Sequence, residues 1–309
     1  MKKLILIMLG VMLIIGLITA VRFIKPKKII EQNQVKVISA ANDELIYKQA
    51  WELANKGDQD KAAAYWKRLA DEFPQSSYAG EALFNIGENY LKKGELLSAE
   101  EAYKKIIQDY PNSKIIKKAQ QSLAGVKISI LFSPIKTTDS QIYEIKPGDT
   151  LDAIARKFNI TVELIKKSNQ LTSDFIRQGQ RLKISNAKFS LIIDKSLHAL
   201  TLKSSEDVIK VYTISTGRPL NPTPVGEFSI VTKLINPVWR TLPPNDPRNI
   251  LGSRWMGFEE PYKEYGIHGT IDPGSMGKDV TKGCVRMLNQ DIEELYAIVP
   301  LGTKVTIIE

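Results

Sequence analysis

The segment Gly266–Met287 reads GIHGTIDPGSMGKDVTKGCVRM and decides how the C-terminal part of the chain is interpreted. It holds Cys284, the single cysteine of the 309-residue chain, and His268, one of its two histidines. An ordinary thiol is mostly protonated near neutral pH, so a nucleophilic cysteine needs an adjacent base. The glycines of the segment permit turns that bring the two groups together and leave backbone N–H groups to face an oxyanion. We therefore predict a Cys–His nucleophilic site, against the alternative of a small buried cysteine.

The residues around this segment alternate between apolar and polar side chains, as half-buried strands do. Strands are expected over 189–194, 199–203, 208–215, 226–232 and 304–308. Asn289 is expected to cap one helix over 291–299. The long Pro-rich segment Asn236–Tyr265 has no clear period and is typical of a lid or substrate-binding loop. These features predict a C-terminal domain over 188–309 that is mainly β and sandwich-like.

A His-Gly-Thr turn at His268, followed by Thr-Lys-Gly-Cys-Val-Arg at Thr281–Arg286, resembles the signature of the YkuD-type L,D-transpeptidase catalytic domain. The resemblance extends upstream to Ser215–Gly217 and Thr223–Phe228. It implies that Cys284 is the nucleophile and His268 its base. It further implies that the Gly283 carbonyl orients the imidazole and that Arg286 holds the site or a substrate carboxylate. Residues expected to bind substrate are Ser275, Gly277, Trp239, Trp255 and Tyr265.

The implied reaction is acyl transfer in cell-wall peptidoglycan. The cysteine would form a thioester with the third residue of a stem tetrapeptide and pass it to an amine of another stem, which forms a cross-link. Carboxypeptidase or exchange activity on the same stems is one alternative, and a non-enzymatic cell-wall scaffold is another. No cofactor is expected, because two distant histidines and one cysteine cannot form a standard zinc site. The second histidine, His198, is expected to be structural.

The stretch Tyr143–Ile184 is expected to fold as strand, helix, helix and strand, with Asp149 or Thr150 capping the first helix. Its PGDTL, Asn169 and GQ-x-L elements resemble a LysM domain, which we place at 141–185. The resemblance implies binding to peptidoglycan glycan strands in a groove that includes Gly148, Asp149, Thr150 and Asn169. The alternative is that these polar side chains only cap helices and turns.

Residues 43–126 show helical spacing and an internal repeat, between linkers at 25–42 and 127–140. Matching residues 37 positions apart are Gly57 and Gly94, Trp66 and Tyr103, Phe73 and Tyr110, Pro74 and Pro111, and Ser76 and Ser113. The pattern resembles tetratricopeptide repeats and predicts a short all-α solenoid. Its function would be to bind a protein partner or to act as a spacer.

The N-terminal residues 1–24 contain an uncharged apolar run, Leu4–Val21, which is long enough to cross a bilayer. We expect an uncleaved single-pass anchor with the catalytic body on the cell-wall side; the alternative is a signal peptide cleaved after Ala20. Charges that follow the run outnumber those before it, which by itself favours the opposite orientation. The net charge of +9 is spread along the chain, so no nucleic-acid partner is expected.

Overall fold

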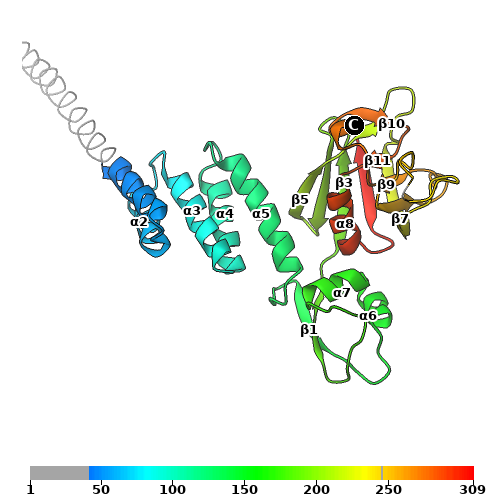
Figure 1. Cartoon of the computed structure of the whole chain (residues 1–309), viewed down its shortest axis with the longest axis horizontal. Coiled ribbons are helices and arrows are strands. Elements are labelled where there is room, and N and C mark those ends of the chain that lie inside the picture. The colour runs from blue at the N-terminus through cyan, green and yellow to red at the C-terminus, as the bar shows by residue number, and fades with distance from the viewer. Residues whose placement is uncertain (1–41, 245) are drawn as a thin grey trace, which may run out of the picture. The chain divides into compact units, whose positions relative to one another are not determined.

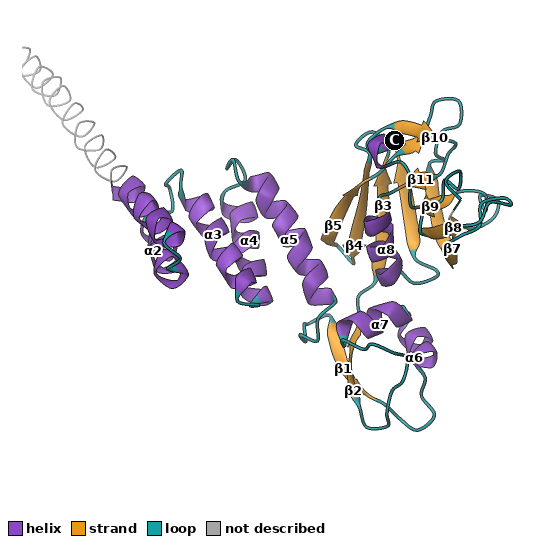
Figure 2. Cartoon of the chain, in the orientation of Figure 1, coloured by secondary structure: helices purple, strands orange, loops and turns teal. Residues whose placement is uncertain are grey.

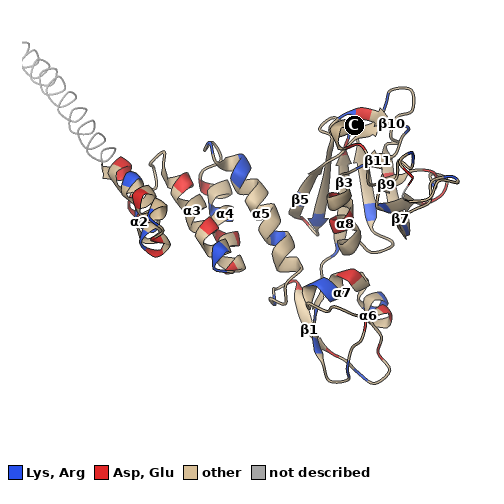
Figure 3. Ribbon diagram, viewed as in Figure 1, with Lys and Arg blue, Asp and Glu red and all other residues tan. Residues whose placement is uncertain are grey.

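The computed structural model describes residues 42–244 and 246–309, which form two compact units that separate between Gln120 and Gln121 (Figure 1). The predicted anchor Leu4–Val21 lies outside the described residues. Within the described ranges, no helix combines the length and apolar character needed to cross a membrane. Figure 3 shows Lys and Arg mixed with Asp and Glu over both units, as expected for a solvated surface.

The first unit consists of helices joined by short turns (Figure 2). They are residues 42–55, α2 (Gln59–Glu72), α3 (Ala79–Lys92), α4 (Leu96–Asp109) and the beginning of α5 (Ile116–Leu131). The repeat is visible in equivalent hydrogen bonds: the Ser76 hydroxyl accepts from the Tyr78 N–H, and the Ser113 hydroxyl accepts from the Ile115 N–H. The prediction of tetratricopeptide-like helical repeats is confirmed.

Small residues allow these helices to pack closely. Ala62 and Ala99 are almost completely buried, and a Cβ at Gly87 would lie only 2.7 Å from the Tyr103 ring. Trp66 is also buried, in a cluster with Tyr47 and other residues of the first two helices. The aromatic side chains of the repeats therefore build the core.

The second unit contains the rest of α5 and then the LysM region, which has the expected order. It consists of β1 (Ser140–Glu144), α6 (Leu151–Phe158), α7 (Val162–Ser168) and β2 (Arg181–Ser185), with β1 antiparallel to β2. Lys183 on β2 is only 4% exposed, and its Nζ donates to the carbonyls of Ile130 and Ser133 near the end of α5. Burial lowers the Lys183 pKa to about 8. The lysine thus satisfies carbonyl groups that a helix end leaves without partners.

The C-terminal region contains one mixed eight-stranded sheet in the order β11-β9-β8-β7-β12-β3-β4-β5. Its strands are β3 (Phe189–Asp194), β4 (Ala199–Ser204), β5 (Asp207–Thr213), β7 (Gly226–Ile235), β8 (Arg254–Phe258), β9 (Gly266–His268), β11 (Val285–Arg286) and β12 (Lys304–Ile308). A separate two-stranded ladder pairs β6 (Thr216–Gly217) with β10 (Asp279–Thr281). The mainly β prediction is confirmed, although the main strands belong to one sheet and not to two stacked sheets.

Two local predictions need correction. The segment expected to be a lid or substrate-binding loop, Asn236–Tyr265, contains β8, which pairs with both β7 and β9, while its described residues before and after this strand form loops. Its register explains the apolar residues there, because Met256 and Phe258 are buried in the sheet. The single helix, α8 (Asn289–Ile298), begins at Asn289, and the side chain of its N-cap residue, Leu288, makes no capping bond.

The α8 helix packs on the sheet through Ile292, Leu295 and Ile298, which are fully buried. Its last turn also meets the LysM region, because the Thr161 hydroxyl donates to the Ala297 carbonyl. The same hydroxyl accepts from the Leu164 N–H and so caps α7. One threonine therefore both starts a LysM helix and joins it to the C-terminal region.

Candidate active site

Two neighbouring strands place the predicted nucleophile and base together. The edge strand β11 runs parallel to β9, and Arg286 stands opposite His268. Cys284 immediately precedes β11, and the same register puts it beside Gly266. Because residues two apart on an extended chain share a face, Cys284 is expected to project from the same side of the sheet as Arg286 and His268, and its Sγ lies 3.7 Å from the Glu264 carbonyl oxygen.

The His268 imidazole is held in one orientation. It is only 2% exposed, and its Nδ1 lies 2.6 Å from the Gly269 carbonyl oxygen. A carbonyl can only accept, so Nδ1 carries the proton and Nε2 remains as the basic nitrogen. The residue expected to orient the imidazole was Gly283, and that prediction is wrong. The chain turns directly after β9, so the carbonyl of the next residue faces the ring.

Trp255 supports the imidazole from the neighbouring strand. It stands opposite His268 in the β8–β9 register, and the two rings stack with centroids 6.1 Å apart and planes inclined by 21°. The sequence predicted Trp255 as a substrate-binding residue. The structure places it against the base, where its ring limits the motion of the imidazole.

A threonine shapes the turn that carries the nucleophile. The Thr281 hydroxyl donates to the Cys284 carbonyl at 2.6 Å and accepts from the Gly283 N–H at 3.2 Å. Gly283 has a φ of +108°, and a Cβ there would lie 2.3 Å from the Tyr265 ring. Tyr265, expected to bind substrate, therefore packs directly over this turn. Since the Gly283 N–H is engaged by Thr281, an oxyanion would need a different backbone donor.

The Arg286 guanidinium has one hydrogen-bonded nitrogen and one buried nitrogen without a partner. Its Nη1 donates to the Ser275 hydroxyl at 3.0 Å, while its buried Nε has no hydrogen-bond partner among the described residues. Ser275 in turn donates to the Asp272 carbonyl at 2.6 Å. Gly277, with a φ of +75°, donates its N–H to the Ile214 carbonyl. Ser275 and Gly277, expected to bind substrate, here fix the loop and the guanidinium.

Burial decides the protonation of the resting pair. It lowers the pKa of His268 to about 4 and raises that of Cys284 to about 11. The Arg286 charge lowers both values, and a backbone hydrogen bond from Gly266 also lowers that of the thiol. Near neutral pH the resting site therefore holds a neutral thiol and a neutral imidazole. The thiolate expected from the sequence has to form when the proton is transferred.

This protonation state gives a testable pH dependence. Iodoacetamide alkylates thiolates, and Cys284 is the only cysteine, so its alkylation reports the ionisation of this thiol alone. We expect slow alkylation at pH 7 that accelerates above pH 9, because the folded thiol has a raised pKa. The measurement is the rate by intact mass from pH 5 to 11, with Cys284→Ala as the blank. A rate already at its plateau at pH 7 would instead indicate a resting thiolate–imidazolium pair.

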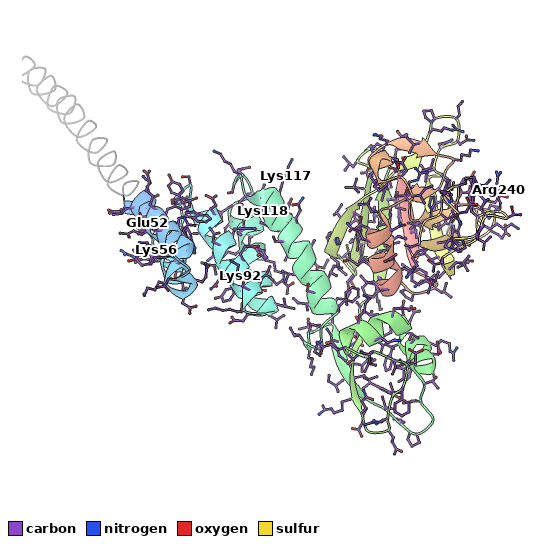
Figure 4. All side chains as sticks on the ribbon, in the orientation of Figure 1. Glu52, Lys56, Lys92, Lys117, Lys118 and Arg240 are labelled. Carbon is purple, nitrogen blue, oxygen red and sulfur yellow. The ribbon has the colours of Figure 1, made fainter. Side chains whose placement is uncertain are left out.

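The loop before β8 is organised by an asparagine that the sequence did not identify. Asn249 is 1% exposed, its Nδ2 donates to the carbonyls of Pro237, Leu242 and Pro243, and its Oδ1 accepts from the Leu251 N–H. The ring of Trp239, expected to bind substrate, lies 5.0 Å from the guanidinium carbon of Arg240. Figure 4 labels Arg240 on this loop. The Asn and Pro residues of this segment predict a loop, but they do not show which side chain bonds to the loop carbonyls.

The other predicted residues have mostly internal partners. His198 lies 3.2 Å from the Asp279 carboxylate, a contact that ties the β3–β4 turn to β10. In the LysM region, Asp149 accepts from the Lys146 N–H, Thr150 caps α6, and Asn169 bonds to both backbone groups of Lys183. Their glycan role remains a prediction. No cluster of three or more His, Cys, Asp or Glu side chains suited to a metal ion occurs in residues 42–244 and 246–309.

Comparison with known families divides the chain into three matching segments. Residues 5–130 match a tetratricopeptide repeat-like domain, residues 143–185 a LysM domain, and residues 188–307 the YkuD L,D-transpeptidase catalytic domain. The three segments follow one another in the expected order.

Related proteins cover the two C-terminal segments. The chain is 36% identical over 171 residues to the putative L,D-transpeptidase YkuD of Bacillus subtilis (strain 168). The matched segment covers 53% of this chain and 97% of that protein. It is 38% identical over 122 residues to YqjB of the same organism, covering 38% of this chain and 69% of that protein. Both relatives have L,D-transpeptidase in their names.

Among solved structures, an L,D-transpeptidase from Mycobacterium smegmatis is similar at 21% identity with a TM-score of 0.33. The match covers 42% of this chain and 64% of that one. The identity to a YkuD protein over nearly its whole length decides the family. This chain belongs to the YkuD family of L,D-transpeptidases and carries its catalytic domain behind a LysM domain and tetratricopeptide-like repeats.

Proposed function

We propose that this protein is a cysteine-dependent peptidoglycan L,D-transpeptidase in which Cys284 forms a thioester with the third residue of a stem tetrapeptide. The observations that carry the proposal are the register that places His268 opposite Arg286, two residues beyond Cys284, and the Gly269 carbonyl, which engages the His268 Nδ1 and leaves Nε2 as the basic nitrogen. An imidazole held this way is suited to general-base catalysis.

The residues divide the reaction as follows. As the Cys284 sulfur bonds to the substrate carbonyl carbon, its proton passes to the His268 Nε2. The imidazolium then gives that proton to the leaving amine of the terminal D-Ala, and the C–N bond breaks. An amine of a second stem loses a proton to the imidazole as it attacks the thioester, and the thiol is released. The half-buried Arg286 guanidinium places a positive charge beside the nucleophile, where it favours the thiolate.

Muropeptide analysis tests this function. The full chain is incubated with peptidoglycan that carries tetrapeptide stems, and the digested products are separated by mass, with Cys284→Ala as the control. We expect cross-links between third residues and loss of D-Ala. Trimmed tripeptide stems without cross-links would favour the carboxypeptidase alternative, and unchanged peptidoglycan would favour a scaffold.

The LysM domain supports binding to peptidoglycan, and it lies in the same compact unit as the catalytic domain. We infer that glycan held by the LysM domain raises the local concentration of stems at Cys284.

We also propose that Leu4–Val21 is an uncleaved membrane anchor and that the catalytic body faces the cell wall. The apolar run is long enough to span a bilayer, and the peptidoglycan substrate class requires an exported enzyme. N-terminal sequencing of the membrane-bound protein is expected to begin at Met1 or Lys2. A sequence that begins at Val21 would show instead that the segment is a cleaved signal peptide.

A further inference from the structure

Asn289 is the first residue of α8, and its side-chain oxygen serves two other segments of the chain. Oδ1 accepts from the Ser253 N–H at 3.1 Å and from the Thr270 N–H at 3.0 Å. We propose that Asn289 is a positioning residue that fixes the loop after His268 and thereby the tautomer of the catalytic imidazole. This inference deepens the proposed function and rests on it.

The loop that Asn289 holds is the one that orients the base. Thr270 directly follows Gly269, whose carbonyl accepts from the His268 Nδ1. The Gly269 N–H donates to the Arg254 carbonyl at 3.2 Å, so the segment is also tied to the beginning of β8. The Gly269 carbonyl and the Thr270 N–H belong to one peptide unit. Asn289 therefore joins this peptide unit to Ser253 and limits the movement of the carbonyl.

The fit around the carboxamide oxygen is close. A Cβ at Gly252 would lie 2.3 Å from the Asn289 Oδ1, and a Cβ at Gly269 would lie 2.2 Å from it. Both positions are glycine, so the two backbone segments can close around this oxygen. The arrangement requires a side chain that places its acceptor oxygen at this position, because a shorter side chain would leave both N–H groups without an acceptor.

The use of the side chain differs from what its place in a helix predicts. An asparagine beside a helix N-terminus commonly accepts from the N–H groups of its own helix. Here the bonds of Oδ1 go to Ser253 and Thr270 instead. Without them the Gly269 carbonyl can shift, the Nδ1 proton loses its acceptor, and the neutral ring populates the other tautomer. That tautomer has a proton on Nε2, which then cannot accept the proton of Cys284.

Kinetics provide the first test. We expect Asn289→Ala to lower the single-turnover rate of thioester formation with a stem tetrapeptide by about tenfold, with an unchanged half-saturation concentration, because positioning affects the chemical step and not binding. Asn289→Asp keeps an acceptor oxygen and is expected to act within about twofold of wild type. Gln290→Ala, at the next exposed position of α8, is the matched control and is expected to match wild type.

The second test reads the tautomer directly. The chain has two histidines, so ¹⁵N-labelling of their rings with His198→Gln for assignment gives an unambiguous signal for His268 in the full chain. We expect a protonated Nδ1 in wild type and in Asn289→Asp, and a mixture of tautomers in Asn289→Ala. A wild-type tautomer in a folded Asn289→Ala variant would overturn the proposal. If wild type fails to acylate while the tautomer still responds to Asn289→Ala, the proposed function fails and the positioning role stands.

Discussion

Alanine at His268 is expected to reduce thioester formation by on the order of 10⁴-fold, whereas Cys284→Ala removes the only sulfur that can form the thioester and is expected to give no adduct. The two side chains act as one unit, because the thiol is neutral at rest and needs the imidazole to take its proton. Without His268 the thiol can react only through the small fraction that ionises by itself. Cys284→Ser is expected to be inactive as well, since a hydroxyl is a much weaker acid than a thiol.

Single-turnover acylation with a stem tetrapeptide, followed as the mass of the adduct, measures each rate. His198→Ala is the matched control, because it removes the only other imidazole and is expected to acylate at nearly the wild-type rate. Wild-type acylation in His268→Ala would show that another group activates the thiol.

Replacement of Gly283 by alanine is expected to reduce acylation by about 100-fold, because the nucleophile turn would have to move. The added Cβ would meet the Tyr265 ring at 2.3 Å, and the φ of +108° is unfavourable for any residue with a side chain. The thermal midpoint is expected to fall in the same variant.

Two further variants separate the clash from the backbone strain. Gly302 also has a positive φ, +81°, but no heavy atom lies within 4 Å of its added Cβ. Gly302→Ala is therefore expected to cost about 1–2 kcal/mol of stability without loss of acylation. Tyr265→Ser combined with Gly283→Ala removes the clash and is expected to recover part of the rate. If Gly302→Ala slows acylation as much as Gly283→Ala, local packing at the nucleophile is not the cause.

Local signals in the sequence were sufficient for much of the fold. The LysM helices were predicted from apolar spacing and from Thr150, whose cap depends only on residues three positions away. The repeats were predicted from their 37-residue period. Strands with clear alternation, such as β3 and β12, were also predicted, because each buries one face of its own sequence.

Features that depend on pairing between distant segments were missed. The short strands β9 and β11 have no period of their own, and only their register brings Cys284 to the face of His268. Asn289 lies 19 positions beyond Thr270 in the sequence, so nothing local marks it as a partner. The carbonyl that orients the imidazole was misassigned for the same reason. Residue types were sufficient to predict the chemistry of the site, whereas the hydrogen bonds that support it could be identified only from the tertiary structure.

The raised pKa of Cys284 has a consequence for the durability of the enzyme. Oxidation to sulfenic acid proceeds through the thiolate, and beyond that stage it becomes irreversible. A thiol that is ionised only while a substrate is being attacked offers peroxide very little reactive sulfur between turnovers. The chain has no second cysteine that could form a disulfide with an oxidised Cys284. A low thiolate fraction therefore protects Cys284 from oxidation in a chain that cannot reverse it through an internal disulfide.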